Sequence, residues 1–168
     1  MADTVSDAFQ GLFQVKMNYL RLDTQEVGYA QNKKNTTTLY TFGDGDNANE
    51  AEVVYADTRT IPANSIDSID LLNLTQNTLS VPVPFAFNRV RILRIVNKAT
   101  ADAAYLYFGA SETNPTQVFA MAVGEQSEAL LINSRDSYEV TSANSILRTY
   151  NPNNFSVDYE IYVVGSQA

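Results

Sequence analysis

The sequence predicts an all-β protein, and three observations carry this prediction. Apolar and polar residues alternate with a period of two in several segments, as in strands that bury one face. Clusters of Pro, Gly, Asn, Asp and Ser recur about every 8–12 residues, a spacing typical of antiparallel sandwiches and barrels. No long stretch combines helical periodicity with helix caps. We therefore expect an antiparallel sandwich.

The alternation is clearest near the two ends of the chain, in GLFQVKMNYL and SVDYEIYVVG. Each of these segments has one apolar and one mostly polar face, which predicts a half-buried strand. RVRILRIVN differs, because it is apolar on both faces: Val90, Ile92 and Val96 fall on one face, Leu93 and Ile95 on the other. This pattern predicts a strand at the centre of the sandwich.

Further strands are predicted between the turn signals, at Thr36–Phe42, Glu52–Tyr55, Thr58–Ile61, Ser65–Leu71, Ala103–Phe108, Gln117–Val123, Glu128–Ile132, Ser137–Thr141 and Ile146–Tyr150. VPVP, at 81–84, is predicted to be a turn. Helical structure is expected only in Thr4–Gln10 and as a single turn at Leu71–Gln76.

The composition changes near residue 57, and this change predicts two parts. Residues 24–52 are polar with few large apolar side chains, whereas every strand from Thr58 onward carries core-forming residues. We expect an extended N-terminal arm with a β-hairpin over residues 1–57 and a β-sandwich domain over residues 58–168. The first part is expected to fold against something else, since a two-stranded hairpin is marginally stable alone.

The composition also excludes most enzyme chemistry. The chain has no cysteine and no histidine, so it lacks a thiolate nucleophile, an imidazole base and the ligands of common zinc sites. A net charge of -8 disfavours nucleic acid as a partner. The only basic cluster, Arg89, Arg91 and Arg94, is expected to face solvent or pair with carboxylates. We expect no enzyme activity, no cofactor, no metal and no contact with nucleic acid or a membrane.

The stretch TFGDGDNANE, Thr41–Glu50, resembles the start of a calcium loop, but the pattern fails. Counted from Asp44, positions 5, 6 and 12 hold Ala48, Asn49 and Tyr55, where an EF-hand loop needs an oxygen ligand, glycine and glutamate. The stretch is predicted to be a tight turn that joins the strand TTTLYTF to AEVVYA, with a weak cation site as the alternative.

Two other groups of residues are candidates for sites. Glu125 and Glu128 have the residue type of a glycosidase pair, but they lie in the turn-rich segment VGEQSEALL and are predicted to be solvated loop charges. The many Tyr and Phe residues include candidates for a sugar-stacking platform. Most fall at inward strand positions, so core packing is the favoured interpretation.

Three segments carry a resemblance to a known family: TRTIPANSIDSIDLLNLT (58–75), FNRVRILRIVNKATADAAYLYFG (87–109) and NFSVDYEIYVVG (154–165). The order of a Thr-rich strand, a V-x-x-L-x-I-x-N strand, a short YLYFG strand and a terminal Y-x-I-x-V-x-G strand resembles the capsid decoration (cement) proteins of tailed bacteriophages. The resemblance covers about Thr58 to Gly165.

The resemblance implies a jelly-roll-like β-sandwich that assembles as a homotrimer. It implies a virion structural protein, made in the host cytoplasm, that binds the outer capsid surface and stabilises contacts between subunits of the major capsid protein. The N-terminal segment supplies the candidate contacts with the capsid, an apolar set that the sandwich does not need: Phe9, Leu12, Phe13, Val15, Met17 and Tyr19. The alternative is that this strand completes the protein's own sheet.

Two other functions stay open at this point. The first is a receptor-binding or fibre-associated module of a phage virion that recognises host glycan through loops such as SETNPT or NPNN. The second is a depolymerase that uses carboxylates alone, which requires two acidic groups with separated pKa values in one cleft. The spacing of Asp and Glu in the sequence indicates no such pair.

Overall fold

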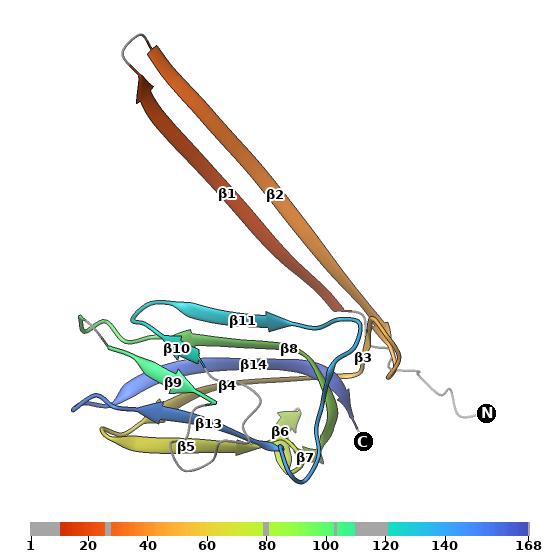
Figure 1. Cartoon of the computed structure of the whole chain (residues 1–168). Coiled ribbons are helices and arrows are strands. Elements are labelled where there is room, and N and C mark those ends of the chain that lie inside the picture. Colours follow the sequence, from red (N-terminus) through yellow and green to blue (C-terminus); the bar gives the residue numbers. More distant parts are fainter. Residues whose placement is uncertain (1–10, 26–27, 79–80, 103, 110–120, 168) are drawn as a thin grey trace.

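The computed structural model describes residues 11–25, 28–78, 81–102, 104–109 and 121–167, with the backbone alone for residues 11–37, 76–78 and 81. Every regular element in these ranges is a β-strand. The predicted all-β sandwich with an extended N-terminal arm is therefore confirmed (Figure 1). Within the same ranges, no helix is long and apolar enough to cross a membrane.

The body of the molecule consists of two antiparallel sheets packed face to face. The first, here the β14 sheet, has the order β11-β8-β14-β4 and contains β4 (Val53–Ile61), β8 (Phe87–Asn97), β11 (Glu128–Ile132) and β14 (Val157–Gln167), with β12 (Tyr138–Glu139) added beside β8. The second, here the β13 sheet, has the order β10-β9-β13-β5 and contains β5 (Ser65–Asp70), β9 (Leu106–Phe108), β10 (Met121–Val123) and β13 (Ile146–Asn151).

The eight main strands of the body pair in a nested order. The first strand, β4, pairs with the last, β14, and the second, β5, pairs with the second to last, β13. The third, β8, pairs with β11, and β9 pairs with its successor β10. The chain is thus doubled over on itself, and successive nested pairs alternate between the two sheets.

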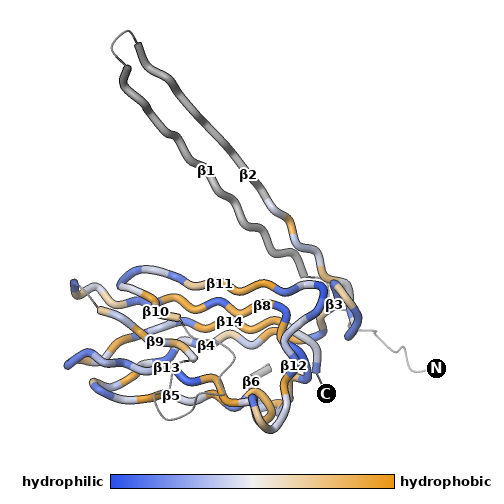
Figure 2. The backbone as a smooth tube through the Cα atoms, in the orientation of Figure 1, coloured by the Kyte–Doolittle hydropathy of each residue, from blue (hydrophilic) through white to orange (hydrophobic). Residues whose placement is uncertain are grey.

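The hydrophobic core fills the space between the two sheets. Its largest fully buried members include Phe87 and Tyr159 from the β14 sheet and Phe108 from the β13 sheet, each 0% exposed. Burying a side chain of this size stabilises the fold by roughly 2–3 kcal/mol. Figure 2 shows the hydrophobic stretches along β8, β11 and β14 that the alternation of the sequence predicts.

A β-bulge in β8 changes which residues face the core. Val164 pairs with Ile92 but Gly165 pairs with Val90, so Arg91 is the extra residue. As a result Val90 packs in the core, whereas Ile92 packs on the outer face of the β14 sheet. The prediction that both share one face is therefore wrong. A Cβ atom at Gly165 would collide with the carbonyl oxygen of Arg89, so the close approach of the strands requires glycine here.

The N-terminal hairpin, here called the arm, consists of β1 (Gly11–Gln25) and β2 (Gly28–Asp44). The strands pair from Gly11↔Phe42 to Gln25↔Gly28, and the arm projects from the body as a two-stranded ribbon (Figure 1). At about 3.4 Å per residue, such a strand spans about 50 Å. The predicted domain boundary at residue 57 lies within β4 and stays a prediction.

The predicted partner of the strand Thr36–Phe42 is wrong. We expected it to form an antiparallel hairpin with the strand that follows the acidic stretch. Instead it belongs to β2, which pairs antiparallel with β1 and makes only a short parallel contact with β3 (Glu50–Ala51). Alternation predicts the face that a strand buries but says nothing about its partner.

Two local predictions are also corrected. The expected helical turn at Leu71–Gln76 is replaced by the strand β6 (Leu74–Thr78), and the expected turn VPVP lies in β7 (Val81–Phe85), its partner. Proline is tolerated in β7 because this strand has a partner on one side only. The helix predicted at Thr4–Gln10 lies outside the described residues.

Candidate interaction site

The predicted contact residues lie on the arm, apart from one. Leu12, Phe13, Val15, Met17 and Tyr19 all belong to β1, whereas Phe9 lies outside the described residues. In the part of the chain that the structure describes, β1 pairs with β2 alone and joins neither sheet of the body. The alternative that this strand completes the protein's own sheet holds only for the small sheet β1-β2-β3, since β1 completes neither sheet of the sandwich.

Strand alternation gives the arm one apolar face. Phe13, Val15, Met17 and Tyr19 occupy alternate positions of β1 and therefore share a face of the ribbon, while Leu12 lies on the opposite face. The directly opposed positions on β2 share that apolar face: Tyr40, Thr38, Thr36 and Lys34. The face also includes Phe42, opposite Gly11, at the base of the arm.

The base of the arm packs on the outer face of the β14 sheet. Phe42 is 4% exposed and forms a small buried cluster with Ala51 and Ile92. The partly buried residues around this cluster are Tyr40, Leu130, Ile132 and Val164. The apolar face of the arm is thus covered by the protein's own body at its base.

A buried arginine fixes the loop that follows the arm. Arg91, the extra residue of the bulge, is 0% exposed. Its Nη2 donates to the carbonyl oxygens of Asp46 at 2.9 Å and Asn47 at 2.7 Å. Its Nε donates to the carbonyl of Glu50 at 3.1 Å, and its Nη1 to that of Arg135 at 3.3 Å. One guanidinium group therefore ties the loop after β2 to the body.

The acidic stretch is a turn, as predicted, but not the predicted hairpin turn, and it helps to attach the base of the arm to the body. It joins β2 to the parallel β3, and Gly45 and Asn49 have φ angles of 133° and 61°. Its carbonyl groups bind the guanidinium group of Arg91, a cation that the protein itself supplies. Within the described residues, no group of three or more Asp and Glu side chains is arranged to hold a metal ion.

The three arginines of the basic cluster have different environments. Arg94 pairs with Glu128 at 2.5 Å and lies over the ring of Tyr162, and Arg89 lies 3.6 Å from Asp46. The prediction for Arg91 is wrong, because it is buried and its partners are carbonyl groups. Burial lowers the pKa of the Arg91 guanidinium, yet arginine stays charged in proteins.

A second arginine lies at the open edge of the sandwich, where β4 and β5 end their sheets. Arg59 donates to both carboxylate oxygens of Asp67, at 2.5 and 2.8 Å, and to Asp57 at 3.0 Å. The hydroxyl of Tyr159 donates to Asp67 at 3.0 Å, and that of Tyr55 to Asp57 at 2.9 Å. A shallow depression of about 310 Å³ lies beside this network.

The network changes the acidity of its members. Burial alone would raise the pKa of Asp67, but the hydrogen bonds from Arg59 and Tyr159 outweigh it and hold that pKa below its usual range. Burial, together with the hydrogen bond to Asp57, raises the pKa of the Tyr55 hydroxyl to about 12. Arg59, Asp57 and Asp67 are all ion-paired within the network. The network therefore links β4 of the β14 sheet to β5 of the β13 sheet.

The other residues singled out in the sequence do not form a common site. Glu128 pairs with Arg94, whereas Glu125 accepts a hydrogen bond from the amide of Ala104. In the loop NPNN, Asn153 donates to the carbonyl of Tyr105 at 2.9 Å. The loop SETNPT lies outside the described residues.

The outer face of the β13 sheet carries a row of exposed apolar side chains, which the sequence analysis missed. Tyr107 on β9, Tyr150 on β13 and Ile66 on β5 occupy neighbouring register positions, and Tyr107 and Ile66 are 40% and 52% exposed. The rings of Tyr107 and Tyr150 stack, with 6.4 Å between centroids. We call these three residues the aromatic row. Tyr105, 47% exposed, lies two residues before Tyr107.

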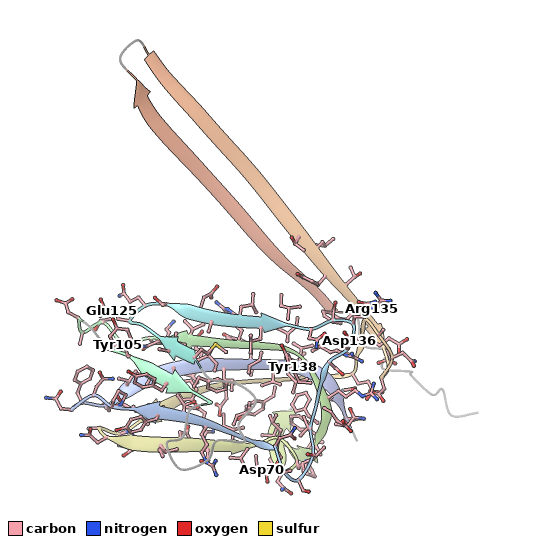
Figure 3. The ribbon with its side chains drawn as sticks, viewed as in Figure 1. Asp70, Tyr105, Glu125, Arg135, Asp136 and Tyr138 are labelled. Atoms are coloured by element: carbon pink, nitrogen blue, oxygen red, sulfur yellow. The ribbon has the colours of Figure 1, made fainter. Side chains whose placement is uncertain are left out.

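Figure 3 shows where these features lie along the body. Arg135 and Asp136 are at the end from which the arm leaves, and Tyr105 and Glu125 are at the opposite end. No protein-family model matches the chain, and no curated protein matches it significantly.

Proposed function

We propose that this chain is a structural protein of a tailed-phage particle, a decoration protein that binds the outer surface of the capsid. The observation that carries the proposal is the arm, a two-stranded ribbon that projects from the body and has apolar residues at alternate positions along one face. Such an arm suits a protein that holds on to neighbouring subunits.

The connectivity of the body supports the proposal. The nested pairing of eight strands across two sheets supports the jelly-roll part of the proposal, and jelly rolls occur in viral capsid proteins and in lectins. The three segments that resemble decoration proteins supply β4, β5, β8, β9 and β14. Because a fold does not determine a function, the arm is the stronger argument.

The mechanism that we propose is mechanical. A clamp that touches several capsid subunits gains by multivalency, since each further contact is made at high effective concentration. A homotrimer offers three identical surfaces to a symmetric site on the shell. Binding to the mature shell alone stabilises that state by mass action. The net charge of -8 suits an outer surface better than one that faces packaged DNA.

Shells of the encoding phage, purified without this protein, provide the test. We expect the full chain to cosediment with the shells, to appear as outer density by electron cryomicroscopy, and to raise the temperature at which the shells break. A Met17→Asp/Tyr19→Asp variant should occupy the shells at least tenfold less well. Val83→Asp, an exposed position on β7, is the matched control and should bind normally. Failure of the full chain to bind shells would overturn the proposal.

A glycan-binding module is the second candidate, and one observation favours it. Tyr105, Tyr107 and Phe155 are exposed near the loop NPNN, and exposed aromatic rings are suited to stacking on sugars. A glycan array tests this function directly. Reproducible binding to one class of sugar, lost in Tyr107→Ala, would favour it over a decoration role.

A further inference from the structure

The longest strand at the end of a sheet in the body is β4. It has nine residues, whereas the other end strands, β5, β11 and β10, have six, five and three. In the part of the chain that the structure describes, β4 pairs with β14 alone, so the backbone groups on its other side have no strand partner. Such a free edge is a template for pairing with a strand of another molecule.

The arm supplies a strand that fits such an edge. β1 has 15 residues and, among the described residues, pairs with β2 alone. Every copy of the chain therefore has two long free edges, one on the arm and one on the body. Backbone hydrogen bonds supply the affinity when a strand adds to an edge. Copies crowded together on a shell, as in the proposed function, bring these edges close to one another.

The inward positions in the middle of β4 hold charged residues. Side chains alternate along β4, so that Tyr55, Asp57, Arg59 and Ile61 all point inward. Tyr55 and Ile61 are 6% and 0% exposed, whereas the side chains of Asp57 and Arg59 between them are 38% and 30% exposed. Arg59 reaches Asp67 on β5, so these charges occupy the opening between the ends of the two sheets.

The opposite side of the sandwich provides the contrast. It ends in β10 and β11, which are short, and the inward positions of β11 hold Ala129 and Leu131. A short end strand offers few backbone groups to a partner. Charges therefore point inward where the end strand is long, and apolar residues do so where it is short.

A strand added to β4 would cover these charges. Its own inward side chains would lie beside Asp57 and Arg59 and displace the water around them. The cost of taking two charges out of water can exceed their mutual attraction, unless new hydrogen bonds replace the water. Two shallow depressions, of about 310 and 340 Å³, both border Asp57 and Arg59, so both groups now have access to water.

We infer that the Arg59 network keeps β4 from pairing with strands of other molecules. The network consists of Asp57, Arg59 and Asp67 with the hydroxyl groups of Tyr55 and Tyr159. Inward charges on an end strand are one of the means by which proteins protect a free edge. A gain in stability explains the charges less well, because well-packed apolar residues in place of a buried ion pair often stabilise a protein.

The test replaces the whole network with apolar residues, in Asp57→Val/Arg59→Met/Asp67→Val combined with Tyr55→Phe/Tyr159→Phe. No charge or hydroxyl group is left without its partner, so the variant should unfold at the same urea concentration as the unaltered protein or at a higher one. Sedimentation velocity at micromolar concentration measures association. The unaltered protein should keep a constant mass over time, whereas the variant should form species that grow with time and concentration.

The matched control adds apolar groups to the same two strands without removing a charge. Ala56→Val/Thr58→Val/Ser68→Val changes three exposed, outward positions of β4 and β5 and should keep a constant mass. Hydrogen exchange then identifies the surface through which the apolar variant associates. Alternate amides of β4 point away from β14. These should exchange rapidly in the unaltered protein and become protected in the assembled variant.

Each outcome decides the inference, and none involves shells, so the result is independent of the decoration role. Growth of the unaltered protein, or assembly of the variant without new protection in β4, would overturn the inference. Lower stability at constant mass would assign the network to stability alone. If the apolar variant fails to fold, the amide variant Asp57→Asn/Arg59→Gln/Asp67→Asn decides in its place, because it keeps polar groups but removes the charges. Growth through β4 supports the inference, and a constant mass contradicts it.

Discussion

Arg91 and Arg59 fix two different regions of the molecule by different means. Arg91, at the base of the arm, is fully buried and donates to four peptide carbonyls. Arg59, at the open edge of the sandwich, has a side chain that is 30% exposed and is held by the carboxylates of Asp57 and Asp67. Arg91 therefore holds the loop after β2 through hydrogen bonds to its backbone, whereas Arg59 is held by ion pairs with carboxylates.

The difference predicts how each region responds to its surroundings. Peptide carbonyls do not titrate, so the acceptors of Arg91 keep their hydrogen bonds at low pH. The carboxylate partners of Arg59 can be protonated. Acid therefore weakens the edge of the sandwich before it weakens the attachment of the arm to the body. Arg91 also depends on the planar fork of its donors, which lysine lacks.

The largest effect is expected from Arg91→Ala. The change removes the buried guanidinium group that donates to the carbonyls of Asp46, Asn47 and Glu50 and should lower the free energy of unfolding by about 4 kcal/mol. Urea unfolding measures the loss. Hydrogen exchange should speed up at the amides of Gly43 and Asn49, which bond within the loop and to Ser134.

Arg91→Lys is the matched control for the geometry of the donors. It keeps the charge but not the fork, so it should recover less than half of the loss. A variant with lysine that is as stable as the unaltered protein would show that charge alone holds the arm, and the contrast between the two arginines would disappear.

A smaller effect is expected from Asp67→Asn. The change removes the charge that Arg59 and Tyr159 bind and should cost about 2 kcal/mol at neutral pH. The folded-state pKa of Asp67 lies below its unfolded value, so its contribution is complete above about pH 4 and falls as the pH drops further. The difference in stability between the two proteins should therefore shrink in acid, measured by urea unfolding. A difference independent of pH would contradict this account.

The smallest effect is expected from Tyr55→Phe, about 1 kcal/mol or less at neutral pH. The folded-state pKa of Tyr55, about 12, lies above the unfolded value of about 10. Its contribution is therefore present below about pH 10 and is lost as the pH rises toward 12. Ultraviolet absorbance should show one fewer late-ionising tyrosine in the variant. Complete ionisation of the unaltered protein near pH 10 would contradict the prediction.

The sequence predicted strands in both sheets of the body and the alternation along β1, because alternation is a local property, but it missed β6 and β7. It did not predict the partner of β2, which depends on contacts far apart in the chain. The bulge was also not predicted. Its extra residue, Arg91, exchanges inward and outward positions only for the part of β8 on one side of it. The available signals were a basic residue inside the apolar run RVRILRIVN and Gly165 in the strand that pairs with it.

The aromatic row was missed for a related reason. Tyr107, Tyr150 and Ile66 come from three strands, and only their register makes them neighbours. Each residue by itself suits a strand in which an aromatic side chain packs inward. The inward and outward positions of β9 both hold large apolar residues, so alternation alone could not distinguish the exposed face.

The nested pairing of the body also sets the order of events during synthesis. Val53 pairs with Gly165, so the outermost strand pair forms only after Gly165 has left the ribosome. Long-range pairing of this kind slows folding. The arm emerges before the body, with its two strands adjacent in the chain, and its base has no sheet to pack on until β8 and β14 meet. On the proposed function, a nascent chain therefore has its contact element before it has a folded body, and premature contact between copies on one polysome is the hazard that this topology creates.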